Sequence, residues 1–305
     1  MFSQNRTIPF WAIHGCMFLS ATLVSTSFIV GKTITPHLDP VVLTLIRFLV
    51  ASLLFAPYVK RHHPLPLPSL LALARYSLIS GALAGFFWLM FLSLRITSPL
   101  HTAAIFTTVP GLSGIYSWFI LRERLGLHRG LALLLAMTGA LWVIFEGNLQ
   151  PLLSLDLNQG DLLFFGGCLL MALYTPLVKL LHRGEPMAVM TLWVLITGCG
   201  WLLLFSAVKL PAIQWASVPA VVWIGIAYLA LFTTIITFFI TQWATLHLGP
   251  TRVMAYSYLY PPLIVLLEWF MYQTLPAGKT MLGILIILPA MVVVQKSKQF
   301  PIAVR

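Results

Sequence analysis

The chain has 305 residues, of which 60% are hydrophobic and only 8% are charged. Soluble domains carry roughly 25% charged residues, so this composition excludes a soluble enzyme and a soluble nucleic-acid-binding protein. The net charge of +11 is typical of a helical membrane protein with basic cytoplasmic loops, and no nucleic-acid partner is expected.

Apolar segments of about 20 residues, the length that crosses a bilayer core as a helix, recur along the whole chain. No small-residue cleavage site follows the first of them, so it is expected to remain as a helix. The longest connections are 147–160 and 60–76, and the latter is predicted to be an extended basic linker. The predicted spans are 10–30, 41–59, 77–96, 102–121, 129–146, 161–180, 188–208, 219–246, 252–272 and 280–295.

The distribution of Lys and Arg predicts the orientation, because these residues resist translocation. With the N-terminus inside, the cytoplasmic segments carry 13 of the 18 basic residues, and one more, Arg47, lies within the second span. The remaining four lie outside: Lys32, Arg95, Lys209 and Lys279. Both termini are therefore expected to be cytoplasmic.

An internal repeat divides the chain into 1–146 and 147–305. A shift of 151 residues aligns Pro99 with Pro250 and Pro110 with Pro261, and Trp118-Phe119 with Trp269-Phe270. Since each half has an odd number of spans, the halves must be inverted relative to each other. The predicted fold is thus an all-α polytopic membrane protein of ten transmembrane helices, built as two inverted five-helix repeats. Such repeats are a transporter architecture with the solute site near the midplane.

The sequence resembles the drug/metabolite transporter superfamily, in its ten-helix EamA-domain branch. The resemblance is carried by the segments Ser25–Lys32, Thr108–Pro110, Leu121–Leu125, Gly160–Leu163 and Tyr260–Pro262, together with Arg47. It implies a transporter of the cell inner membrane that exports a small metabolite by alternating access, with amino acids or related amphipathic compounds as cargo. Two fused halves can form a complete solute site within one chain, so a monomer is sufficient for transport. A homodimer is the alternative oligomeric state.

Paired prolines give the physical pointer to that site. Pro110 lies near the middle of the fourth span and Pro261-Pro262 near the middle of the ninth. A proline lacks an N–H and displaces the carbonyl four residues back, and broken backbone in a membrane is tolerated mainly where it lines a cavity or finds side chains. Equivalent breaks in both halves favour a central cavity, and the alternative is an ordinary kink repaired by Ser or Thr.

Aromatic and hydroxyl side chains at membrane depth accompany these prolines. Tyrosine hydroxyls away from the interface need partners, which a wet cavity would supply, although core packing explains any single one of them. As a group they predict a weakly polar, aromatic pocket. The candidate substrate-binding residues are Phe87, Trp88, Thr107, Pro110, Tyr174, Tyr256, Tyr258 and Tyr260, with Thr233 and Thr234 in the eighth span as further candidates.

Three ionisable residues within spans are candidates for coupling or gating. Arg47 is expected to make a structural or gating contact. Glu268 is either a proton site or, as we favour, the counter-ion of Arg47. His14 either titrates near neutral pH or is an interfacial histidine.

Missing groups narrow the function further. The chain has no phosphate loop, nucleotide fingerprint or metal-ligand cluster, so no cofactor, metal or direct use of ATP is expected. No carboxylate lies near the midplane, which disfavours a cation/proton antiporter. The first alternative is a proton-coupled exporter of lipophilic drugs that depends on Glu268. A more remote one is a membrane-embedded lipid enzyme, which would need an interfacial cluster of His, Asp or Ser that the sequence does not show.

Overall fold

The computed structural model describes residues 10–65, 67–122, 126–148 and 158–296. Every regular element within these ranges is helical. Nine of the helical segments are long and apolar enough to cross a membrane, and Gly130–Ile144 adds a shorter apolar helix. The predicted all-α polytopic fold is confirmed.

Helices α2 and α4 of the first half begin where short polar side chains cap them. The Asp39 carboxylate accepts a hydrogen bond from the backbone N–H of Val41 at 3.0 Å, and the Ser98 hydroxyl accepts one from that of His101 at 3.1 Å. A proline follows each cap at the first helical position. The helices are α1 (Phe10–Ile34), α2 (Pro40–His62), α3 (Leu70–Ser93), α4 (Pro99–Phe106), α5 (Val109–Leu121) and α6 (Leu127–Ile144).

The second half repeats this order with more interruptions. Its eighth span is divided by a π-helical segment, and its ninth by a 3₁₀ segment. The elements are α8 (Gln159–Leu181), α9 (Met187–Ser206), the short turns η1 (Leu210–Ala212) and η2 (Trp215–Ser217), α10 (Ala220–Ala230), η3 (Leu231–Ile236), α11 (Thr237–Leu248), α12 (Pro250–Met254), η4 (Ala255–Leu259), α13 (Tyr260–Tyr272) and α14 (Gly278–Lys296).

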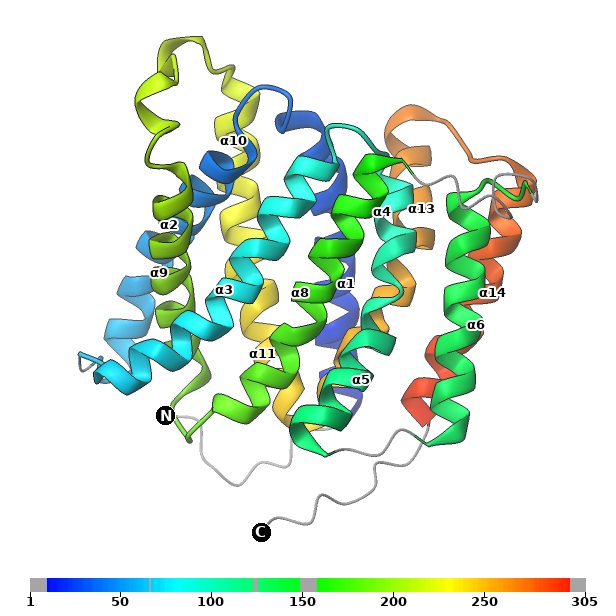
Figure 1. The fold of residues 1–305 in the computed structure, drawn as a ribbon, viewed down its shortest axis with the longest axis horizontal. Coiled ribbons are helices and arrows are strands. Elements are labelled where there is room, and N and C mark those ends of the chain that lie inside the picture. The colour runs from blue at the N-terminus through cyan, green and yellow to red at the C-terminus, as the bar shows by residue number, and fades with distance from the viewer. Residues whose placement is uncertain (1–9, 66, 123–125, 149–157, 297–305) are drawn as a thin grey trace.

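The two halves interleave. Helix α2 packs against its counterpart α9, and α6 packs against its counterpart α14. Helix α3 lies against α8, and in the equivalent contact α10 and α11 lie against α1. Figure 1 shows α2 and α9 at one edge of the molecule, α6 and α14 at the other, and α1 behind α8 in the middle. The interface at the centre of the molecule is therefore built from helices of both repeats.

The contact between α6 and α14 depends on two glycines. A Cβ atom on Gly139 would lie 2.8 Å from the backbone oxygen of Gly283, and a Cβ on Gly283 would lie 2.8 Å from that of Gly139. Small residues allow this close approach of helix backbones in a membrane, where packing and not water exclusion holds helices together.

The predicted linker at 60–76 is wrong in its extent. Lys60–His62 form the last turn of α2, and α3 begins at Leu70 after the cap Ser69. The basic residues continue α2 to His62, whereas prolines disfavour the helical conformation in the residues before them, and no helix is present again until Leu70. Most of the predicted connection 147–160 lies outside the described residues.

Candidate functional site

The fourth span is broken immediately before Pro110. Helix α4 ends at Phe106 and α5 starts at Val109. The Thr107 hydroxyl donates to the carbonyl of Ala104 at 2.7 Å, and the Thr108 hydroxyl donates to that of Ile105 at 2.8 Å. Each of these carbonyls also accepts the backbone N–H of the same threonine at 3.0 Å, so each threonine closes a tight i→i+3 turn with both its backbone and its side chain. The predicted site residues Thr107 and Pro110 are both buried here.

The equivalent break in the ninth span is longer. Five residues, Ala255–Leu259, form a 3₁₀ turn before α13 begins at Tyr260. Three predicted site residues are buried here, Tyr256 and Tyr258 in the turn and Tyr260 at the start of α13. The 3₁₀ turn packs against α1, α5 and α14, so it touches both halves of the molecule.

The ends of the two breaks meet. Phe106, the last residue of α4, and Tyr260, the first of α13, have ring centroids 5.2 Å apart. Both rings also pack on Phe28 of α1, at 6.1 and 6.0 Å. Phe86 of α3 and Phe164 of α8 complete this aromatic cluster around Phe106. The interruptions of both repeats therefore share one central contact.

The hydroxyl groups of η4 differ in their partners. A hydrogen bond joins the Tyr256 hydroxyl to Nδ1 of His14, which ties the beginning of α1 to the break. The Tyr258 side chain is completely buried, and its hydroxyl has no hydrogen-bond partner among the described residues. The Ser257 hydroxyl beside it has none either. Buried unsatisfied hydroxyls are costly, so these two groups are the candidates in this turn for a hydrogen bond to a solute.

Arg47 lies about 10 Å along α2, at 1.5 Å per residue, and its side chain is completely buried. Its Nε donates to the Thr234 hydroxyl at 2.6 Å, and its Nη2 donates to the carbonyl and the hydroxyl of Thr233 at 2.9 and 3.0 Å. The guanidinium carbon lies 4.2 Å from the ring centre of Phe87, another predicted site residue. The guanidinium is therefore surrounded by uncharged hydrogen-bond acceptors and by an aromatic ring in cation–π contact.

The π-helical segment η3 makes the arginine contact possible. The wider turn lets the hydroxyls of consecutive residues, Thr233 and Thr234, both reach the carbonyl of Leu229, at 3.0 and 2.8 Å. The same two hydroxyls face Arg47. Single π turns inside α-helices occur frequently at functional sites. Sequence reasoning named the two threonines but did not predict the π turn.

A buried polar chain was missed by the sequence reasoning, apart from its member Tyr174. The Gln242 amide of α11 donates from Nε2 to the Tyr174 hydroxyl at 3.0 Å. The Thr191 hydroxyl of α9 donates to Oε1 of the same amide. All three side chains are buried. The signal was available, since an amide within an apolar span needs hydrogen-bond partners on other helices.

The favoured pairing of Arg47 with Glu268 is wrong. Arg47 is held by η3, and none of the ion pairs between described residues involves Glu268. Glu268 is half-buried near the end of α13. The prediction placed both residues toward the outer face from their depth along the chain, but the rotation of each helix about its axis decides which side chains meet.

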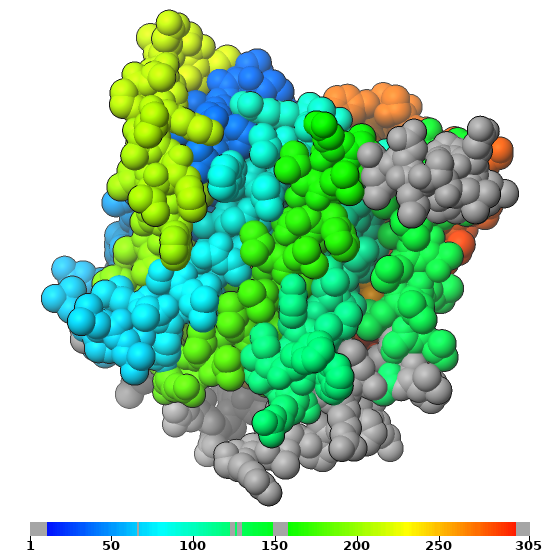
Figure 2. Space-filling model, viewed as in Figure 1, coloured from blue at the N-terminus to red at the C-terminus, as the bar shows by residue number. Residues whose placement is uncertain are grey.

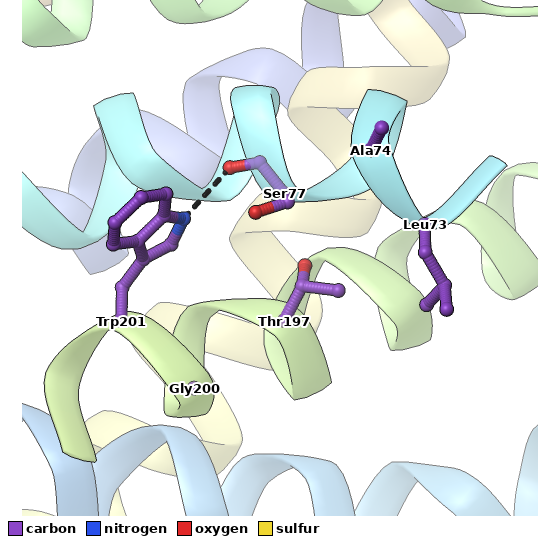
Figure 3. Close-up of a pocket in the computed structure, with 6 residues that line it drawn as sticks. All are labelled: Leu73, Ala74, Ser77, Thr197, Gly200 and Trp201. Carbon is purple, nitrogen blue, oxygen red and sulfur yellow. Dashed lines mark hydrogen bonds between the residues drawn. The ribbon is translucent and has the colours of Figure 1, made fainter. Parts of the chain in front are cut away.

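Trp88 lies apart from the other candidates. Its ring stacks on Phe205 of α9 at 5.4 Å, and it lines a mostly apolar cavity of about 340 Å³ between α3, α8 and α9. These three helices are visible together on the face in Figure 2. A neighbouring open groove of about 440 Å³ lies between α3 and α9 and shares Trp201. Figure 3 shows the Trp201 indole donating to the Ser77 carbonyl there, at 3.0 Å.

A two-repeat helical membrane protein with paired broken helices at its centre is a transporter by architecture. Residues 11–145 and 158–295 each match the EamA-like transporter family, and the chain belongs to that family. The resemblance predicted from the sequence is confirmed. Members of this family are transporters and not enzymes, which removes the lipid-enzyme alternative.

Two curated relatives come from Bacillus subtilis (strain 168). The chain is 26% identical over 208 residues to the uncharacterized transporter YyaM, covering 66% of this chain and 68% of that protein. It is 25% identical over 237 residues to the uncharacterized transporter YetK, covering 76% and 70%. A crystal structure of a further protein superposes with a TM-score of 0.68 and 18% identity, over 93% of this chain and 97% of the other. That likeness shows a shared fold.

Proposed function

We propose that this transporter exports an amino acid or a related amphipathic metabolite across the cell inner membrane by alternating access. The observation that carries the proposal is the meeting of the two broken spans, where Phe106 and Tyr260 touch between the halves. Interrupted helices give each half a point at which it can bend. Bending at both points would open the central contact toward one face or the other.

The chemistry around the breaks favours a solute with both polar and apolar parts. Aromatic rings from α1, α3, α4, α8 and α13 surround the central contact. The buried Tyr258 hydroxyl adds a polar group without a described partner. A metabolite with an apolar side chain and hydrogen-bonding groups would satisfy both features. Alternating access allows net flux in either direction, and export is proposed here from the family resemblance.

Flux in proteoliposomes tests this proposal. Radiolabelled neutral and aromatic amino acids would be measured with and without an imposed pH gradient, in the native chain and in Tyr258→Phe. The substitution removes only the hydroxyl, so we expect flux to fall about fivefold or more, the factor for one buried hydrogen bond to the solute. Tyr272→Phe is the matched control, because Tyr272 is exposed at the end of α13.

Flux of an amino acid that falls in Tyr258→Phe and not in Tyr272→Phe supports the proposal. Absence of flux for every amino acid tested would contradict it. The rival, a proton-coupled exporter of lipophilic drugs, draws on Glu268, a half-buried carboxylate without an ion pair among the described residues. It predicts drug flux that follows the pH gradient and disappears in Glu268→Gln.

A further inference from the structure

The Arg47 guanidinium carries a buried charge that no described carboxylate balances. The side chain has no exposed surface, and none of the ion pairs between described residues includes it. Burying an unpaired charge is expensive, even when neutral groups donate or accept around it. An uncharged side chain could join α2 to η3 at a lower desolvation cost. The buried charge therefore indicates a role beyond holding these two elements together.

The guanidinium is also incompletely bonded. Nε and Nη2 are engaged by Thr233 and Thr234, which fixes the plane of the group. Nη1 is buried and has no hydrogen-bond partner among the described residues. The rings of Phe87 and Phe91 lie 4.2 and 5.8 Å from the guanidinium carbon. One open NH2 group on a fixed cation, beside apolar rings, is what a carboxylate on an apolar solute would meet.

We propose that Arg47 is the anchor for the carboxylate of the transported solute. This inference rests on the proposed function and narrows its substrates to amphipathic carboxylic acids. The open Nη1 group carries two N–H donors and fits a carboxylate oxygen through a charge-assisted hydrogen bond. The neighbouring Phe87 packs on Phe48 and Phe238, and these rings would receive the apolar part of the solute.

The placement of Arg47 lets binding bias the conformation. Its partners belong to η3 of the second repeat, while Arg47 and Phe87 belong to the first. Neutralising the cation would change how strongly the two repeats hold together at this point. A solute that binds one arrangement more tightly than the other shifts the equilibrium toward it, which alternating access requires.

Matched acid and amide pairs test the anchor in the native protein. Three pairs are used. The first is 3-phenylpropanoate and 3-phenylpropanamide, the second is L-phenylalanine and its amide, and the third is L-leucine and its amide. Binding is measured from the shift of thermal unfolding in detergent, and flux from proteoliposomes. We expect at least one acid to bind about tenfold more tightly than its amide, the factor for one charge-assisted hydrogen bond.

Substitutions of the anchor then decide the role of Arg47. Arg47→Gln should reduce the ratio of acid to amide affinity to about one, because a neutral amide no longer favours an anion. Thr234→Val removes the acceptor of Nε with little change in shape, and should weaken acid binding several-fold while leaving the amide unchanged. Because this second substitution keeps the charge, it keeps the proposal testable should Arg47→Gln fail to fold.

The outcomes separate this inference from the proposed function. Equal binding of acids and amides, or a preference for acids that persists in Arg47→Gln, would overturn the anchor. If metabolite flux is observed in either case, the proposed transport function is kept and only the role of Arg47 as an anchor is rejected. Preferential binding of acids without flux would support the anchor and contradict the proposed transport.

Discussion

Gln242 shows how a single polar residue is accommodated at membrane depth. Its amide has one acceptor and one donor group, and the structure engages both, through Thr191 on α9 and Tyr174 on α8. Three helices are thereby fixed at one point. Arg47 differs, since one of its donor groups stays open. Fully bonded polar groups tend to be structural, whereas partly bonded ones are candidates for binding.

The bond between Gln242 and Tyr174 should contribute to stability. Tyr174→Phe leaves the ring in place beside Phe238 and removes the acceptor of the amide. We expect the free energy of unfolding to fall by about 1 kcal/mol, within the range for hydrogen bonds between membrane helices. Unfolding followed by tryptophan fluorescence in detergent measures it. An unchanged stability, or an equal loss in the exposed control Tyr272→Phe, would contradict this role.

Prolines alone do not break these helices. Pro57, Pro176 and Pro289 lie inside α2, α8 and α14, which continue through them. At Pro110 the break occurs with Thr107 and Thr108 bonded to carbonyls of the preceding turn. At Pro261 a 3₁₀ turn takes that place. Both breaks therefore combine a proline with a tighter, i→i+3 bonded turn immediately before it.

The break before Pro110 is expected to serve movement more than stability. Pro110→Ala restores the backbone N–H and favours a continuous helix. We expect flux of the transported metabolite to fall several-fold while the thermal stability is kept or raised. Pro289→Ala is the control, because α14 is already continuous there. Native flux in Pro110→Ala, measured in the same proteoliposomes, would show that the break is not a hinge.

The whole molecule is organised by the contacts between repeats. Helix α2 contacts α9, and α6 contacts α14. The other helices of the first half, α1, α3, α4 and α5, also contact helices of the second half. The first described turn of α1 and the last of α14 lie at the same face (Figure 1). The charges of the loops predict that this face is cytoplasmic.

Cysteine labelling tests the orientation. In a chain with Cys16, Cys168 and Cys199 replaced by Ser, single cysteines would be placed at Lys209 and at Arg183, which are both exposed. These positions flank α9 at its opposite ends. A membrane-impermeant maleimide added to intact cells should label Lys209→Cys and spare Arg183→Cys until the membrane is opened. The reverse pattern would contradict the expected orientation.

The sequence by itself determined the spans, the internal repeat, the family and the approximate places of the broken helices. These depend on local properties: the length of apolar segments, the position of prolines and the recurrence of residues at a fixed shift. Only the tertiary structure decided which side chains meet. It placed Arg47 on Thr233 and Thr234 instead of Glu268, and brought Phe106 against Tyr260. Such contacts depend on the rotation of each helix and on local π and 3₁₀ winding, which the packing of distant segments sets.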